Sequence, residues 1–193
     1  MDTRPGHNWG LKAGRTFDRQ PILTGDLLLL RPLQAADFAD LYAVAADPLM
    51  WEQHPAKTRY QEAFFKQFFQ EALESGGAFV AIDRADDRIV GSSRFHGYDE
   101  EKSEIEIGWS FLARSHWGGR YNHEMKQLML RHAFQFVNNV IFRVDFQNYR
   151  SQRAVEKIGG VLVGTRLGSS GRTSFVYRIT AASFFSSKEE KQP

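Results

Sequence analysis

Two adjacent glycines, Gly118 and Gly119, lie between a strand-like run over 104–112 and a helical pattern that begins near residue 120. Glycine tolerates backbone conformations in which several N–H groups point the same way, and the first turn of a helix adds positive potential. Together these features can hold phosphate groups. We therefore predict a pyrophosphate-binding loop over 114–124, with an ordinary β–α turn as the alternative.

Two glutamates precede this loop. Glu104 and Glu106 stand two positions apart on one predicted strand, so their side chains share a face. The apolar residues of the run take the other face: Ile105, Ile107 and Trp109. Gly108 follows on the carboxylate face and leaves room for a ligand. A carboxylate here would attract an ammonium group and accept a proton from it, directly or through water. The alternative is the solvated face of an antiparallel sheet.

Two histidines are further candidates for chemistry. His96, in the preceding predicted strand, is a second candidate base because imidazole titrates near neutral pH. A structural role is the alternative, since a lone histidine in a strand is commonly structural. His116 stands beside the glycine pair, where it would approach a phosphate or cap the turn, and we favour the cap.

Hydrophobic periodicity predicts the elements that must position these side chains. Helical spacing of apolar residues predicts helices over 35–46, 59–75, 120–137 and 149–158. Strand-like runs lie at 27–31, 78–83, 88–98, 103–112, 140–146, 161–166 and 173–180. Short polar turns join the second, third and fourth strands, so we expect an antiparallel meander there and a hairpin from the last two strands.

The composition predicts one folded domain with a segregated charge. The chain has 193 residues, 42% of them hydrophobic, which suits a sizeable core. Residues 32–110 carry 7 Lys and Arg against 15 Asp and Glu, whereas residues 111–178 carry 11 against 3. This asymmetry predicts an anionic ligand for the second half and a cationic one for the first. Nucleic acid is a rival ligand, but no basic run or basic–aromatic interleaving supports it.

Several classes of site and location are not expected. The absence of cysteine excludes disulfides and thiolate chemistry, and a reducing cytoplasm is the default compartment. The sequence contains no run of about 18 apolar residues, so we expect no transmembrane helix. The six histidines lack metal-binding spacing, so we expect no metal. We expect residues 1–21 to form an arm, residues 22–185 the domain and residues 186–193 a polar tail.

The predicted order of elements, β-α-α-β-β-β-α-β-α-β-β, is accompanied by recognisable motifs. They are LLLRPLQAADF at 28–38, IVGSS at 89–93, EIGW at 106–109, the loop at 114–124, and NYRSQRAVEKIG at 148–159. With this order, they resemble the GNAT acyltransferase superfamily over residues 22–180. The resemblance is strongest to its RimJ/RimL-like branch, which acetylates protein N-termini and related amines.

The resemblance implies a fold and a reaction. The fold is α/β (α+β), with a central mixed, mostly antiparallel sheet of about seven strands flanked by about four helices and splayed between the fourth and fifth strands. The reaction is direct transfer of an acetyl group from acetyl-CoA to a primary amine, either a protein N-terminus or a small amine, in a ternary complex. On this basis the candidate catalytic residues are Glu106, Glu104 and Ser151, with Ser151 at the thiolate. The phenylalanine-rich helix over 59–75 is core, or a lid over the acceptor site.

The resemblance also assigns residues to the cofactor. Backbone groups of Ser110 and Leu112 would bind the pantetheine amides as an added strand does. Asn148 would face the pantetheine arm, with a simple helix N-cap as the alternative. Arg150 and Arg153 would meet the 3′-phosphate or lie on a solvated helix face. The predicted cofactor set is Ser110, Phe111, Leu112, Trp117, Gly118, Gly119, Arg120, Tyr121, Asn122, Asn148 and Ser151.

Two positions depart from the family pattern. The phosphate loop usually reads Trp-Gly-x-Gly-Tyr-Ala, but Arg120 fills the place of its second glycine here. Val155 stands where the superfamily frequently has a tyrosine as general acid, so the proton donor is unassigned. A catalytically weak CoA-binding sensor of the same fold is therefore the alternative function. The sequence names neither the acceptor amine nor the oligomeric state, and a homodimer stays open.

Overall fold

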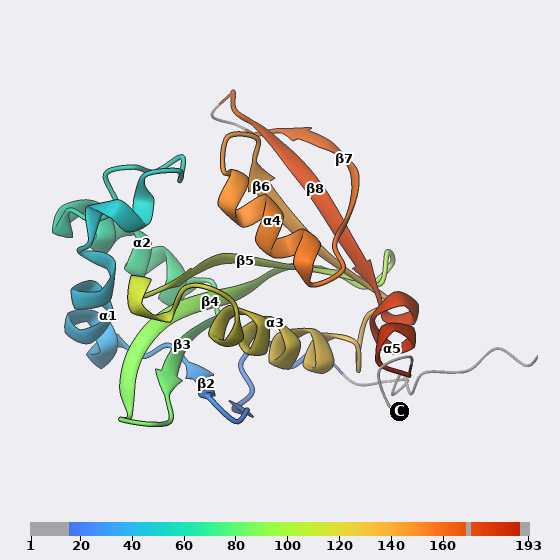
Figure 1. Ribbon diagram of the computed structural model, residues 1–193, viewed down its shortest axis with the longest axis horizontal. Coiled ribbons are helices and arrows are strands. Elements are labelled where there is room, and N and C mark those ends of the chain that lie inside the picture. Colours follow the sequence, from blue (N-terminus) through green and yellow to red (C-terminus); the bar gives the residue numbers. More distant parts are fainter. Residues whose placement is uncertain (1–15, 169–170, 190–193) are drawn as a thin grey trace, which may run out of the picture.

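One sheet of eight strands runs through the described part of the protein (Figure 1). The computed structural model describes residues 16–168 and 171–189. In sheet order the strands are β1 (Leu23–Thr24), β2 (Leu28–Pro32), β3 (Ala78–Asp83), β4 (Arg88–Asp99), β5 (Glu104–Leu112), β6 (Asn139–Asp145), β8 (Thr173–Thr180) and β7 (Val161–Leu167). The α-helices are α1 (Phe38–Ala45), α2 (Glu62–Glu74), α3 (Arg120–Ala133), α4 (Tyr149–Lys157) and α5 (Ala181–Glu189). Short 3-10 turns are η1 (Ala35–Asp37), η2 (Pro48–Trp51) and η3 (Arg114–His116).

The sheet divides between β5 and β6. These two strands run parallel and pair over Glu104–Glu106 opposite Asn139–Ile141, whereas all other neighbours are antiparallel. Beyond Glu106 the strands diverge, which confirms the predicted splay. The meander and the final hairpin are confirmed as well. The extra strand is β1, whose two residues are too few to leave an alternating pattern in the sequence.

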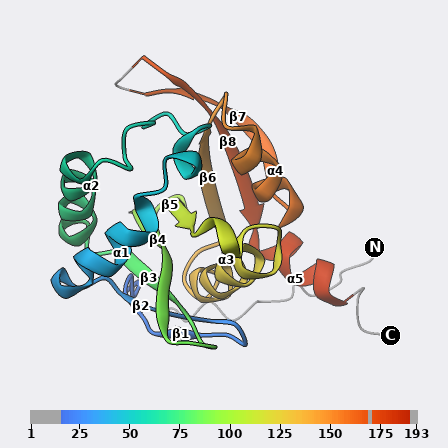
Figure 2. The same ribbon diagram turned by 60° about the vertical axis from the view of Figure 1, so that its left-hand side comes forward.

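Helices cover both faces of this sheet (Figure 2). On one face lie α1 and α2, and the buried phenylalanines of α2 are Phe65, Phe68 and Phe69. This burial confirms that the phenylalanine-rich helix is part of the core. On the other face, Met125 of α3 and Val155 of α4 belong to a second hydrophobic cluster with the inner residues of β6.

A bulge in β5 changes which side chains face which side of the sheet. The register between β4 and β5 shifts just before Arg94, and Trp109 has a φ of +52°. The centroid of the Trp109 ring consequently lies 5.0 Å from that of His96, the β4 partner of Glu106. The expectation that Trp109 lies on the isoleucine face is therefore wrong, because strict alternation ends where an extra residue enters a strand.

Glu124 fastens α3 to the first strands. Its carboxylate accepts hydrogen bonds from the backbone N–H groups of Asp26, Leu27 and Leu28, at 2.9, 2.9 and 2.7 Å. A side chain at Gly25 would displace this carboxylate, since an added Cβ would lie 2.5 Å from its Cδ. The loop in front of α3 is thereby held in a fixed position relative to the sheet.

Both ends of the described chain pack against the domain. Phe17, within the predicted arm, is buried against the rings of Phe95 and Tyr98, while residues 1–15 lie outside the described residues. The expected polar tail from 186 is partly wrong, because α5 continues to Glu189; residues 190–193 are not described. The apolar residues of α5 form no clear stripe, so hydrophobic periodicity did not predict this helix. None of the described helices combines the length and apolar character needed to cross a membrane.

Candidate active site

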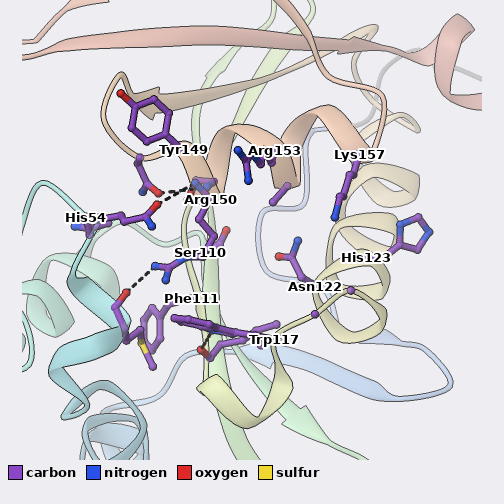
Figure 3. Close-up of a pocket in the computed structure, with 18 of the residues that line it drawn as sticks. His54, Ser110, Phe111, Trp117, Asn122, His123, Tyr149, Arg150, Arg153 and Lys157 are labelled. Carbon is purple, nitrogen blue, oxygen red and sulfur yellow. Dashed lines mark hydrogen bonds between the residues drawn. The ribbon is translucent and has the colours of Figure 1, made fainter.

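A cavity of about 1090 Å³ lies between β5, α3, α4 and the segment around η2 (Figure 3). It brings together ten of the eleven residues predicted to hold a cofactor: Ser110, Phe111, Leu112, Trp117, Gly118, Gly119, Arg120, Asn122, Asn148 and Ser151. Tyr121, the eleventh, is not among the lining residues. The chain from Met50 to His54 also lines the cavity, although this segment carries no motif that predicts a place in the site.

Gly118 and Gly119 form the turn in front of α3. Their φ angles are +99° and +135°, in a region that side-chain-bearing residues rarely adopt. The carbonyl of Gly119 accepts a helical hydrogen bond from the N–H of His123 at 2.9 Å. The N–H groups of the preceding first turn have no partner within the helix and can bind an anion. Arg120 is already the first helical residue, so its position does not require glycine.

The loop is attached to β3 from outside the cavity. Asp83 accepts a hydrogen bond from the Tyr121 hydroxyl and forms another with Nε2 of His116, each at 3.0 Å. The rings of His116 and Tyr121 are also in contact, with centroids 4.6 Å apart. The backbone N–H of Ala85, together with these two side chains, holds the pKa of Asp83 below its usual range. This placement favours the structural role of His116 and turns the Tyr121 hydroxyl toward the sheet.

Positive side chains outnumber negative ones on the walls of this cavity, which is larger than the one that adjoins it. Arg120 lines it from the loop side, and Arg150, Arg153 and Lys157 line it from α4, against Glu52 near η2. Figure 3 shows Arg153 and Lys157 on α4, across the cavity from α3. The cavity therefore favours an anionic ligand, as the charge of the second half of the chain predicts.

Another wall of the cavity is the edge of β5 that faces the gap where β5 and β6 diverge. β4 pairs with β5 up to Leu112, whereas β6 pairs with it over 104–106. The backbone around Ser110 therefore borders the gap, where an extended ligand could pair with it. The Leu112 carbonyl already accepts a hydrogen bond from the Trp117 indole at 2.8 Å. The side chain of Phe111 is buried against α2, so this residue offers the cavity mainly its backbone.

Asn148 and Ser151 begin α4 at the opposite wall. The side-chain oxygen of Asn148 accepts a hydrogen bond from the backbone N–H of Ser151 at 3.2 Å. The predicted N-cap is therefore confirmed. Capping fixes the orientation of the buried Asn148 side chain and leaves its amide nitrogen as a donor for another partner.

A second cavity of about 310 Å³ adjoins the first. The residues that line both are His54, Ser110, Asn122, Asn148, Ser151, Ala154 and Ile158. Gly108 and Trp109 of β5 line the smaller cavity on one side, and residues 142–145 of β6 line it on the other. It thus extends through the gap between the strands, toward the face that carries Glu106.

Glu106 lies beside the smaller cavity. Its side chain is buried, and Oε2 is 3.0 Å from Nη1 of Arg143, which lines that cavity. This contact is electrostatic, since Oε2 has no hydrogen-bond partner among the described residues. A Cβ on Gly108 would lie 3.5 Å from Oε1, so glycine leaves the carboxylate open toward the cavity. Burial raises the pKa of Glu106 although Arg143 opposes the rise, so this carboxylate is a stronger base than an exposed one.

Glu104 and His96 lie farther from the cavities. The Glu104 carboxylate is 3.9 Å from Nη2 of Arg178, and neither Glu104 nor His96 lines the two cavities. His96 is opposite Glu106 in β4, and burial together with nearby arginines lowers its pKa. The lowered pKa favours the neutral form of its imidazole.

Several titratable residues of the cavities carry no motif that predicted a role for them, and of these His54 and Lys126 have the most strongly lowered pKa values. His54 lines both cavities, and burial together with the charge of Arg59 lowers its pKa to about 3. Lys126 lines the smaller cavity, where burial lowers its pKa to about 7. Lys126 follows Asn122 by one helical turn, so helical spacing could have placed both on one face. His54 follows an irregular segment and carries no such signal.

Known proteins share this fold. A family model described as an acetyltransferase (GNAT) domain matches residues 28–161. A GCN5-related N-acetyltransferase from Brucella melitensis matches with a TM-score of 0.78 and 18% identity, over 88% of this chain and 83% of that one. A GNAT-family acetyltransferase from Bacillus anthracis gives 0.69 and 21%, over 83% and 98%. RimJ from Mycobacterium smegmatis, in complex with CoA-disulfide, gives 0.63 and 19%, over 86% and 84%. No curated protein matches the sequence.

Proposed function

The chain belongs to the GNAT acetyltransferase family, and we propose that it transfers the acetyl group of acetyl-CoA directly to a primary amine within a ternary complex. One observation carries the proposal: the larger cavity connects the glycine turn before α3 with the gap between β5 and β6. A ligand with a pyrophosphate at one end of an extended amide-containing arm needs both features together. The cavity supplies anion-binding N–H groups for the first and an open strand edge for the second.

The lining residues fit CoA in chemical type. The glycine turn and the first turn of α3 would hold the pyrophosphate, and Arg150 and Arg153 would neutralise the 3′-phosphate. The backbone of Ser110 would pair with the pantetheine amides, with Asn148 and Ser151 facing the arm from α4. The CoA-disulfide named in the complex of the M. smegmatis relative supports extending this ligand class to the present chain.

Glu106 is the proposed proton acceptor on the acceptor side. An amine at physiological pH is largely an ammonium ion and must lose a proton before its nitrogen can attack the thioester carbonyl. The buried carboxylate beside the smaller cavity would accept that proton, directly or through water. Glu104, two residues away, adds negative potential that attracts the ammonium, while Arg143 limits the rise in the pKa of Glu106.

For the acceptor, we propose an amine of the class used by the RimJ/RimL-like branch, a protein N-terminus or a small primary amine. The sequence motifs over 28–38 and 148–159 support this branch. The acidic first half of the chain supports a cationic acceptor.

Calorimetry with CoA and a turnover assay with acetyl-CoA test the proposal together. We expect CoA to bind and raise the melting temperature. Release of free thiol from acetyl-CoA should depend on the addition of one member of a panel of N-terminal peptides, polyamines and amino-acid amides. Binding without amine-dependent thiol release would favour the sensor function. Absence of binding at millimolar CoA would refute the ligand assignment itself.

A further inference from the structure

Lys126 is a deeply buried lysine that lines the smaller cavity. It lies on α3 one turn after Asn122, and its side chain is 5% exposed. The helix directs it to the gap between β5 and β6, where the two cavities meet. A lysine is rarely so buried without a charged partner, so its contacts are informative.

The hydrogen bonds of Lys126 end on two neutral hydroxyl groups. Nζ donates to Oγ of Ser93 at 3.3 Å and to Oγ of Ser110, and these two hydroxyls are 2.7 Å apart. Nζ also lies 5.7 Å from the centroid of the Phe142 ring. Ser110 lines both cavities, whereas Lys126 lines the smaller one. The serine hydroxyl thus connects the ammonium to the space where the two cavities join.

Burial lowers the pKa of Lys126 to about 7. Near neutral pH the ammonium and the amine are therefore both populated, as a group that gives up a proton and regains it in each cycle requires. The charged and titratable residues around the same cavity are His54 after η2, Arg143 and Asp145 on β6, and Arg172 before β8. Arg172 is 3.0 Å from Asp145, and Arg143 is equally close to Glu106 on the other face, so these charges largely offset each other.

Val155, on α4, has no proton that its side chain could donate. It lines the smaller cavity and is buried, and Gly160 packs so closely that an added Cβ there would lie 2.4 Å from Cγ1 of Val155. Glycine at 160 is therefore what lets the turn after α4 pack against Val155. The wall formed by α3, by contrast, carries an ammonium group.

We propose that Lys126, acting through the Ser110 hydroxyl, supplies the proton that the sulfur of CoA takes up as acetyl transfer occurs. This inference rests on the proposed acetyl-transfer function. The carbon–nitrogen bond forms as the carbon–sulfur bond breaks, and the electron pair of the broken bond goes to sulfur. Sulfur takes the proton of the Ser110 hydroxyl, and Ser110 takes one from the Lys126 ammonium. The acceptor loses two protons on becoming an amide: one replaces the proton lost by Lys126, and the other leaves to solvent.

A titration of the CoA thiol tests this without knowledge of the acceptor. Thiolate absorbance in the ultraviolet gives the thiol pKa of CoA bound to the wild-type protein, to Lys126→Met, and to Lys66→Met as a control on the exposed face of α2. A cation near the sulfur stabilises the thiolate. We expect the bound thiol of Lys126→Arg, whose guanidinium stays charged above pH 7, to titrate about one pH unit or more below that of Lys126→Met. Wild type and Lys66→Met should resemble Lys126→Met, because Lys126 has lost its proton at the pH where the thiol titrates.

Lys126→Arg separates charge from proton donation. The arginine carries a cation that lowers the thiol pKa at every pH of the titration, but it does not release its proton. Amine-dependent turnover should therefore fall in Lys126→Arg as it does in Lys126→Met, by about tenfold to a thousandfold.

Equal thiol pKa values in Lys126→Arg and Lys126→Met, with CoA bound to both, would overturn the proposal, because position 126 would then not face the sulfur. If Lys126→Met does not fold, Lys126→Arg is compared with free CoA, and a bound thiol that titrates no lower than that of free CoA would also overturn the proposal. If neither variant folds, wild-type turnover that does not fall as the pH rises above about 7 would overturn it. Failure of the wild type to bind CoA would instead refute the proposed function, so the two failures are distinguishable.

Discussion

The guanidinium carbon of Arg150, on α4, lies 4.0 Å from the centroid of the Trp117 ring in the loop before α3. This contact crosses the larger cavity, and Nη2 of Arg150 also donates to the Met50 carbonyl at 2.8 Å. Three segments that are distant in the sequence therefore meet at one cationic side chain. The Arg150 guanidinium therefore forms part of the cavity wall, where it would attract a bound anion.

We expect Arg150→Ala to weaken CoA binding by about 5- to 50-fold, because hydrogen bonds to a charged group contribute more than neutral ones. Calorimetry measures the affinity, and Arg131→Ala, on an exposed part of α3, is the matched control. An affinity equal to or above that of wild type would show that Arg150 closes the cavity and does not hold the ligand.

Gly119→Ala tests whether backbone N–H groups hold the phosphates. An added Cβ would have open space, but a φ of +135° is strained for alanine, so the turn must rearrange. We expect a loss of CoA affinity of about tenfold or more, and a smaller loss for Arg120→Ala. Gly164→Ala on β7, which also has open space and no positive φ, should bind CoA normally. A larger effect of Arg120→Ala would make that side chain the main phosphate ligand.

Glu106→Gln keeps the shape of the side chain but removes its charge and basicity. We expect kcat to fall by about tenfold to a thousandfold with CoA affinity almost unchanged. Because burial raises the pKa of Glu106, wild-type activity should fall with decreasing pH at a value above the usual range of glutamate, and this acidic limb should disappear in the variant. Glu100→Gln, in the exposed β4–β5 turn, is the control. Wild-type turnover by Glu106→Gln would leave the carboxylate without a catalytic role.

Lys126→Met should stabilise the protein at neutral and acidic pH. The folded protein binds this proton with a pKa of about 7, against 10.5 in the unfolded chain, so the unfolded state holds more protons between these values. Wild-type stability therefore rises with pH across this window, and the burial penalty is complete below about pH 7. We expect Lys126→Met to gain roughly 2–4 kcal/mol at pH 6, with a difference that narrows toward pH 10.5. Urea unfolding at several pH values measures this, and a pH-independent difference would contradict it.

Glu124→Ala should destabilise the fold. Three backbone N–H groups of the β1–β2 segment would lose their acceptor together. We expect a loss of about 2–4 kcal/mol in the free energy of unfolding, with Glu100→Ala as an exposed control that changes it little. Glu124→Gln should lie between the two, because an amide retains one acceptor oxygen. A loss as small as that of the control would mean that water replaces the carboxylate.

The sequence by itself determined most of the elements and the local features of the larger cavity, its glycine turn and its helix cap. Amphipathic spacing located α2, α3 and α4, and alternation located the strands of the meander, because both patterns depend on neighbours in sequence. The glycine turn at 118–119 was predicted for the same reason, since its backbone conformation is a local property. Asn148 was likewise predicted as a cap from its place before a helix.

Only the tertiary structure decided which side chains that are distant in the sequence come together, and how deeply each is buried. The bulge that turns Trp109 toward His96 depends on the register of two strands. His54 and Ser110 line the same cavities although they are far apart along the chain. The low pKa of Lys126 arises from desolvation between α3 and the sheet, and desolvation is set by everything that packs around a group, not by its place in the sequence.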